Sequence, residues 1–258
     1  FLAKLDNPSL DELRSLPVSK ILEAQHRVID NDGNRDFGVD AFYPSWGGEV
    51  LPLPPSELIS ESAGSHIPLL IGTNEDEMSL WGITSFDDKN TERYIQRITK
   101  DSENFKSVYR KRLGDVKAGW LGCAISSDWV FRIPAVRVAE SRDLFDSETF
   151  MYKFSWDSTA FDGQLGAAHA LEIPFTFNML DRPGVTLFIG TGPRPDALAQ
   201  TMHDAWASFI KTGDPSTSTL GEWPIYNSET RTVMNFDEEC SLLFDPETEE
   251  RTLWHQLR

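Results

Sequence analysis

The stretch Ile67–Thr73 constrains the fold of this chain more than any other part of the sequence. It reads I-P-L-L-I-G-T, a short continuous apolar run, and the polar turn Asn74–Glu77 follows it at once. A strand that is apolar on both sides is typical of a parallel sheet whose two faces are covered by helices. The run therefore predicts a buried strand in a parallel sheet, with carboxylates where the strand ends.

Two further segments have strand character, and helical patterns lie between the three strands. Thr149–Trp156 is aromatic-rich and alternates, and Thr232–Phe236 is a third strand. Helical patterns dominate from about residue 91 to residue 145, and Ala197–Thr212 is the best amphipathic helix, with Gly213 as its stop. Strands separated by long helical stretches predict an α/β fold rather than an all-β one.

Both ends of the chain are predicted to be helical. Ser9 is a helix cap followed by acidic residues, Pro17 interrupts the helical pattern, and the turn at residues 31–34 ends it. Residues 38–57 are rich in Gly and Pro and predict an irregular loop, and the tail from about Pro246 predicts a final helix. Since there is no internal repeat and no clear linker, residues 1–258 are predicted to belong to a single domain.

The composition narrows the range of partners. Among the 258 residues, 41 are Asp or Glu and 24 are Lys or Arg, which gives a formal charge of -17. Such a surface repels phosphate backbones and anionic headgroups, so neither nucleic acid nor a membrane surface is an expected partner. No run of 18 apolar residues exists, and a cytoplasmic location is expected, although the chain lacks an initiator Met and an export signal stays open.

Candidate cofactor and metal ligands are few. Cys123 and Cys240 have no partner at metal-ligand spacing and are expected to be free thiols, with a single disulfide left open. Four histidines have the same lack of partners and are expected to have surface or capping roles: His26, His66, His203 and His255. No metal site and no cofactor are therefore predicted.

Two segments carry side chains suited to catalysis. The first is the turn Gly72–Glu77, where the predicted strand ends in three adjacent carboxylates; the second is Leu165–Phe175, L-G-A-A-H-A-L-E-I-P-F, which contains His169. Open α/β sheets present functional residues on the loops beyond the carboxyl ends of their strands. Spacing alone nevertheless favours structural roles for Glu77 and His169.

The ordered motifs of the chain resemble those of the type-B carboxylesterases, which include para-nitrobenzyl esterases and cholinesterases. I-P-L-L-I-G-T-N-E-D-E is similar to the segment of that family that bears the catalytic acid, and L-G-A-A-H-A-L-E-I-P-F-T-F to its histidine segment. Further similar segments follow the family order from about Phe42 to the C-terminus: Ser127–Glu140, Trp206–Ser216 and Glu222–Tyr226. The resemblance implies the C-terminal portion of an α/β-hydrolase fold, a partial mixed sheet with flanking helices.

The resemblance also implies residue roles. The pattern G-T-N-x-x-E maps the triad acid onto Glu77, and the histidine segment maps the triad base onto His169, while Glu172 stays outside the triad. Such a base takes the proton of a serine nucleophile, and the carboxylate fixes its tautomer. Two departures from the family pattern are residues 44–48, where an Asp-Gly pair is common, and Met78, where a glycine is common.

Ser62 is the only near match to a nucleophile elbow. It lies in S-E-S-A-G, but position 60 is Ser where the G-x-S-x-G elbow has Gly, and the segment precedes a strand whereas an elbow follows one. The seven residues of the Ile67–Thr73 strand span roughly 23 Å, so Ser62 and Glu77 cannot both reach one imidazole. Ser62 is therefore predicted to be a loop serine.

The chain is thus expected to be the C-terminal half of a carboxylic-ester hydrolase that uses a Ser-His-Glu triad. The nucleophile and the oxyanion hole would lie on a missing N-terminal half, and the chain alone would be inactive. Its expected partners are a small-molecule ester and either that missing half or a second copy of itself, since a split sheet exposes a strand edge. The alternative is a catalytically silent, cholinesterase-like binding or scaffold domain.

Overall fold

The computed structural model describes residues 1–31, 44–81 and 87–257, and these fall into two compact units, Phe1–Pro55 and Ser56–Arg258. Along the described residues, no helix is at once long and apolar enough to cross a membrane. Cys123 is buried, Cys240 is half-buried, and both are free thiols, as expected.

The first unit is helical. It contains a 3-10 turn η1 (Leu2–Leu5), α1 (Leu10–Ser15) and α2 (Val18–Asn31). Ser9 caps α1 in a capping box: its Oγ accepts the Glu12 N–H at 3.3 Å, and Glu12 Oε2 accepts the Ser9 N–H at 2.8 Å. The predicted cap is confirmed, and so is the interruption at Pro17. The predicted turn at residues 31–34 lies mostly outside the described residues.

The second unit is built on a four-stranded mixed sheet in the order β1-β2-β3-β4. β1 (Leu69–Asn74), β2 (Thr149–Phe154) and β3 (Thr232–Phe236) are parallel neighbours, and β4 (Ser241–Phe244) pairs antiparallel with β3. The three predicted strands and the α/β fold class are confirmed. β4 was not predicted, because four residues at a sheet edge are too few to show a period.

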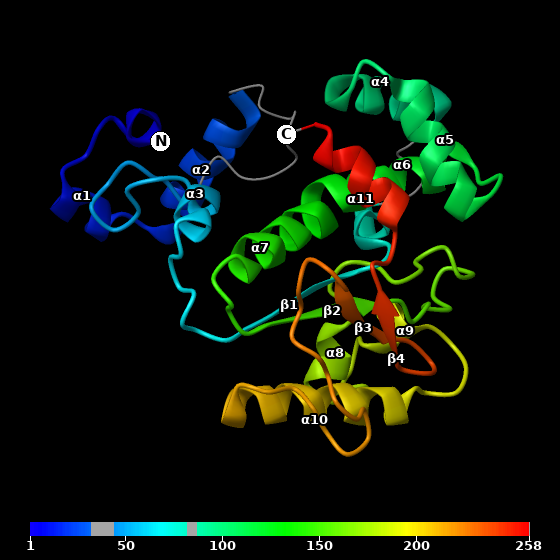
Figure 1. Ribbon diagram of the computed structural model, residues 1–258. Coiled ribbons are helices and arrows are strands. Elements are labelled where there is room, and N and C mark those ends of the chain that lie inside the picture. Colours follow the sequence, from blue (N-terminus) through cyan, green and yellow to red (C-terminus); the bar gives the residue numbers. More distant parts are fainter. Residues whose placement is uncertain (32–43, 82–86, 258) are drawn as a thin grey trace. The chain divides into compact units, whose positions relative to one another are not determined.

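Helices cover both faces of this sheet. Figure 1 shows α7 (Ile133–Asp143) on one side and α8 (Ile173–Thr176) with α10 (Asp196–Thr212) on the other. Alternate side chains of β2 serve the two faces: Phe150 and Phe154 pack in the cluster that contains α10, while Met151 packs in the cluster that contains α7. Burial on both faces explains the apolar character that predicted the strands.

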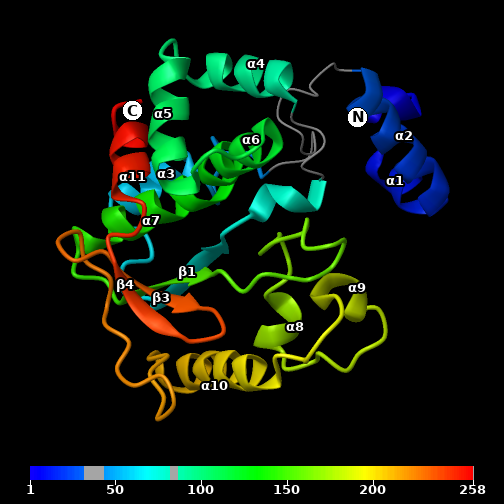
Figure 2. The ribbon, with the colours of Figure 1, turned by 90° about the vertical axis from the view of Figure 1, so that its right-hand side faces the viewer.

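A group of helices packs beyond the sheet around its own core. It comprises α4 (Asp88–Ile98), α5 (Ser102–Leu113), α6 (Ala118–Ser127) and the C-terminal helix α11 (Thr248–His255) (Figure 2). Their shared core includes the buried side chains Ile95, Phe105, Tyr109, Leu121, Ile125 and Trp254. A single π-helical turn, η5 (Asp128–Arg132), joins α6 to α7. The helical patterns predicted for residues 91–145 and for the C-terminal tail are confirmed.

One predicted boundary changes and another is confirmed. The irregular loop expected over residues 38–57 ends early, because α3 (Pro55–Ser60) begins inside it; a proline is readily accepted in the first turn of a helix. Residues 38–43 of that loop lie outside the described part of the chain. Gly213 ends α10 in the left-handed conformation with φ of +83°, as predicted. The remaining short helices are η3 (Glu77–Trp81) and α9 (Thr186–Ile189).

Candidate active site

Glu77 and His169 lie on two loops that the backbone ties together. Glu77 opens η3 directly after the end of β1, and His169 lies on the loop between β2 and α8. Asp76 pairs with Ala168 in an isolated parallel bridge, in which the Asp76 N–H donates to the Ala167 carbonyl at 3.0 Å. The His169 N–H donates to the Glu77 carbonyl at 3.2 Å. Both loops therefore extend the parallel pairing of the sheet beyond its last residues.

The side chains of Glu77 and His169 form a short hydrogen bond. Nδ1 of His169 lies 2.6 Å from Oε2 of Glu77, and Glu77 is only 6% exposed. An ionised carboxylate can only accept, so in a neutral imidazole that makes this bond the proton lies on Nδ1 and the lone pair on Nε2. The His169 side chain is 40% exposed. The pair has the geometry of a general base oriented by a carboxylate.

The surroundings of Glu77 act on its pKa in opposite directions. Burial raises the pKa of this carboxyl, and the nearby charge of Glu172 raises it further. The Asn74 N–H, which donates to Oε1 at 2.9 Å, and the bond from His169 both lower it. Burial is the largest of these effects, and the net direction is upward.

The three carboxylates of the turn have separate partners. Glu75 pairs with Lys153 at 3.2 Å and with Arg112 at 3.3 Å. Oδ2 of Asp76 accepts the Ala167 N–H at 3.2 Å, and only Glu77 meets the imidazole. The turn by itself left three candidates for the acid, and the fold brings one of them to His169.

Asp76 makes the closest approach between the two loops. Gly166 has φ of +59°, and a Cβ at that position would lie 2.4 Å from Asp76 Oδ2, so only a glycine fits there without a shift. Burial and the charge of Glu75 raise the pKa of Asp76 to about 6.

Two aromatic rings flank the imidazole. The centroid of Trp81 lies 5.2 Å from that of His169, and the centroid of Phe131 lies 5.1 Å away. Phe131 comes from the π turn η5, and Ser127, the last residue of α6 just before that turn, accepts the Met78 N–H at 3.0 Å through its Oγ. The imidazole of His169 is therefore bordered by two aromatic side chains.

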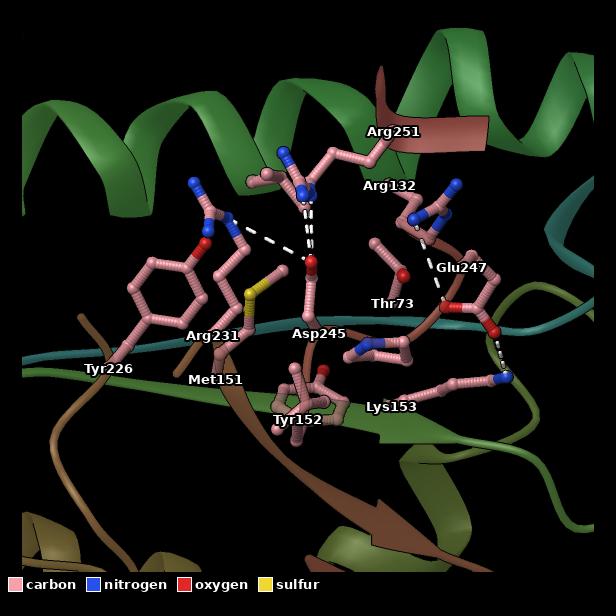
Figure 3. Close-up of a pocket in the computed structure, with 13 residues that line it drawn as sticks. Thr73, Arg132, Met151, Tyr152, Lys153, Tyr226, Arg231, Asp245, Glu247 and Arg251 are labelled. Atoms are coloured by element: carbon pink, nitrogen blue, oxygen red, sulfur yellow. Dashed lines mark hydrogen bonds and ion pairs between the residues drawn. The ribbon is translucent and has the colours of Figure 1, made fainter. Parts of the chain in front are cut away.

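Buried charged side chains hold the turn that follows β1 through Glu75. Lys153 on β2 donates to Glu247 at 2.7 Å as well as pairing with Glu75, and Glu247 also faces Arg132 (Figure 3). Arg132, Lys153 and Glu247 line one end of a cavity of about 30 Å³. Asp245, held by Arg251, lines another part of it. The cavity has room for a water molecule and lies on the α7 side of the strands.

The structure does not bring Ser62 to this pair. Ser62 lies in the turn after α3, with φ of +76°, and the whole of β1 separates it from Glu77. No strand-turn-helix elbow surrounds it, so its prediction as a loop serine is confirmed. Among the described residues, no group of three or more His, Cys, Asp or Glu side chains could hold a metal ion.

The sequence motifs did not predict a role in the site for Asn74. It is 4% exposed, and its side-chain amide donates to the Ala168 carbonyl and to Glu172 Oε2, both at 2.6 Å. The only sequence signal was its place in G-T-N, at the end of a predicted strand and three residues before Glu77. Its partners are 94 and 98 residues away along the chain, beyond the reach of local patterns.

Comparison with known proteins identifies the relatives of this chain. The chain is 30% identical to the para-nitrobenzyl esterase of Bacillus subtilis (strain 168) over 253 residues, which are 96% of this chain and 50% of that protein. It is 28% identical to the phenmedipham hydrolase of Pseudarthrobacter oxydans, covering 89% of this chain and 47% of that protein. The chain thus spans about half the length of these relatives.

Solved structures agree with this relationship. The Geobacillus stearothermophilus carboxylesterase EST55 superposes with a TM-score of 0.78 at 29% identity, over 98% of this chain and 52% of that one. The fold is accordingly that of the α/β-hydrolases. A sequence model described as the carboxylesterase family matches residues 6–254. With almost its whole length matched, the chain belongs to the carboxylesterase family.

Proposed function

We propose that this chain supplies the acid and the base of a Ser-His-Glu triad in a carboxylic-ester hydrolase, Glu77 and His169 being these two residues. The observation that supports this most directly is the 2.6 Å bond between His169 Nδ1 and the buried Glu77 carboxylate, in a histidine whose side chain is 40% exposed. The nucleophilic serine and the oxyanion hole would come from a further polypeptide segment, called here the complementary segment. The chain spans about half of its relatives, which leaves room for such a segment.

The proposed reaction follows from the two ring nitrogens. Nε2 of His169 takes the proton of the serine hydroxyl as its oxygen attacks the ester carbonyl. Glu77 stabilises the imidazolium that forms, and Nε2 then gives the proton to the departing alcohol. The same base next takes a proton from water as the water oxygen attacks the acyl-serine. Nε2 then returns that proton to the serine oxygen as its bond to the acyl carbon breaks, which releases the acid and the free serine.

The free edge of β1 is the proposed place for the complementary segment. Among the described strands β1 pairs only with β2, and the Glu75 N–H, just past its end, still donates to Phe154 on that side. Because backbone groups alternate along a strand, the N–H groups of Leu70 and Gly72 face the other edge. A parallel strand added there would end close to His169, where a serine on the following turn could reach Nε2.

The substrate class is proposed from the walls of the site and from the relatives. Trp81 and Phe131 border the imidazole and suit an apolar or aromatic ester. The name of one relative specifies a para-nitrobenzyl esterase, so para-nitrobenzyl acetate is a suitable test substrate.

The test combines the chain with the complementary segment by co-expression and measures hydrolysis of para-nitrobenzyl acetate. The combined protein should hydrolyse the ester, whereas the chain alone should not. Glu77→Gln should lower kcat by about 10⁴-fold and His169→Ala by about 10⁶-fold, the losses that removal of the acid and of the histidine cause in serine hydrolases.

His203→Ala is the matched control, because His203 is exposed on α10 and bonds only to the Thr176 carbonyl at 3.0 Å. It should leave kcat unchanged. Full activity in the Glu77 or His169 variant would refute these roles. A combined protein that folds but hydrolyses no ester would favour the alternative of a silent binding or scaffold domain.

A further inference from the structure

Asn74 bonds to both loops that carry the Glu77–His169 pair. Its backbone N–H bonds to Glu77 Oε1 at 2.9 Å, and its side-chain Nδ2 bonds to the carbonyl of Ala168, the residue before His169. The same Nδ2 also donates to Glu172 Oε2. One buried side chain thus links the acid, the backbone of the histidine loop and a second carboxylate.

The direction of the Asn74 N–H is set by the sheet. Glu75 donates its N–H to β2, so the N–H of Asn74 points to the other side, where none of the described strands competes for it. The last residue of β1 is therefore free to bind a side chain. Glu77, three residues later, folds back and accepts that bond.

The side chain at position 74 lies between two carboxylates. Glu77 and Glu172 are close enough for the charge of Glu172 to act on the pKa of Glu77. An amide is neutral and offers two N–H donors, which satisfy the Ala168 carbonyl and Glu172 without adding charge. An aspartate has the same shape, yet it would place a third negative charge there and leave the Ala168 carbonyl without its donor.

We propose that Asn74 is a positioning residue: its neutral amide holds the histidine loop and Glu172 in place while its backbone holds Glu77, so that the imidazole stays in one tautomer and orientation. This inference rests on the proposed roles of Glu77 and His169. It is tested first by a spectroscopic signature that needs no nucleophile, so that its failure can be told apart from a failure of the esterase proposal.

The spectroscopic test uses the chain with 15N-labelled histidine and records the ring nitrogens of His169, assigned with His169→Ala. The ring should show one tautomer, with the proton on Nδ1. In Asn74→Asp the two nitrogen signals should move towards each other, as expected when both tautomers are populated. Asn178→Asp is the control: Asn178 is exposed, its Nδ2 donates to Gln200 at 2.8 Å, and the His169 signals should not change.

A second variant reverses the donor and the acceptor. In Asn74→Asp with Glu172→Gln, the new amide at position 172 can donate to the new carboxylate at position 74, and the total charge is unchanged. The single-tautomer signals should return in part, because position 74 still has no donor for the Ala168 carbonyl. In the combined protein of the esterase test, kcat should fall about tenfold or more in Asn74→Asp, with KM nearly unchanged, and should recover in part in the double variant.

The outcomes separate the hypotheses. Wild-type ring signals in Asn74→Asp, or a double variant that behaves like the single one, would overturn the positioning role. If Asn74→Asp does not fold, as judged by thermal melting, Asn74→Ala decides, because it removes both donors without adding charge. An unchanged His169 spectrum in a folded Asn74→Ala chain would equally overturn the proposal. If the His169 signals change in the Asn74 variants but no combined protein hydrolyses the ester, the positioning role of Asn74 is supported and the esterase proposal is refuted.

Discussion

At the scale of single residues, the turn after β1 shows how neighbours in sequence acquire different chemistry. Glu75 is held by cations, Asp76 by a backbone N–H and Glu77 by an imidazole. Each partner comes from a different part of the chain. The sequence placed three carboxylates together, and only the resemblance to a family distinguished Glu77 from the other two.

Asp76→Asn should stabilise the chain in a pH-dependent way. Burial raises the pKa of Asp76 from 3.8 to about 6, so the folded chain retains a proton that the unfolded chain releases between these values. Ionisation of Asp76 therefore lowers the free energy of unfolding as pH rises towards 6, by up to about 3 kcal/mol. An Asn Oδ1 still accepts the Ala167 N–H and cannot ionise.

Urea unfolding at several pH values checks this prediction. The gain from Asp76→Asn should be small near pH 4, grow up to about pH 6 and stay constant at pH 8. Asp181→Asn, an exposed change, should alter stability by less than about 0.5 kcal/mol at every pH. An equal gain at pH 4 and pH 8 would show that the charge of Asp76 is not the cause.

At the scale of elements, the π turn η5 connects the helical core to the site. Its first and last residues, Asp128 and Arg132, form a paired hydrogen bond with both distances 2.6 Å, and Asp128 also accepts the Tyr109 hydroxyl. The same turn presents Phe131 to the ring of His169. A π turn inserts a residue into a helix and changes which side chains face a neighbour. Here that change places an aromatic residue at the site and an ion pair in the core.

Arg132→Met should destabilise the chain by about 3–5 kcal/mol. It leaves Asp128, which is 4% exposed, without its counter-charge, and removes the cation that faces Glu247. The same substitution at Arg194, whose pair with Asp196 is exposed, should cost less than about 1 kcal/mol. Chemical denaturation of both variants measures the difference, and similar losses would argue against a structural role for the π-turn pair.

At the scale of the whole molecule, one edge of the sheet lies beside the proposed active site. β4, a short antiparallel strand, forms the far edge of the described sheet, whereas β1 forms the edge beside the Glu77–His169 pair. An open edge is a template for another strand. The proposed complementary segment would use it, and so could a second copy of the chain.

Leu70→Pro should block this pairing while leaving the chain folded. The Leu70 N–H faces the open edge, so proline removes a donor that β2 does not use, as proline does on natural edge strands. Ile71→Pro is the control, since its N–H faces β2 and its loss should unfold part of the sheet. Light scattering and binding of the complementary segment report the result. Undiminished association of Leu70→Pro would place the interface elsewhere.

Local sequence patterns were sufficient to predict most of the helices and strands. The apolar runs of β1, β2 and β3, the cap at Ser9 and the stop at Gly213 all depend on residues within one turn or one strand, where periodicity and capping act. The sequence did not predict β4, because this strand is short and lies at an edge of the sheet. It did not predict the start of α3, because prolines are typical of a loop as well as of the first turn of a helix.

The sequence by itself thus determined the α/β class, the three parallel strands, the family and the two residues proposed as acid and base. Only the tertiary structure decided that Glu77 meets His169 across 92 residues and that Asn74 lies between Glu77 and Glu172. The physical reason is the range of the interactions. Periodicity and capping act between residues a few positions apart, whereas a hydrogen bond between two loops exists only after the register of the strands that carry them is fixed.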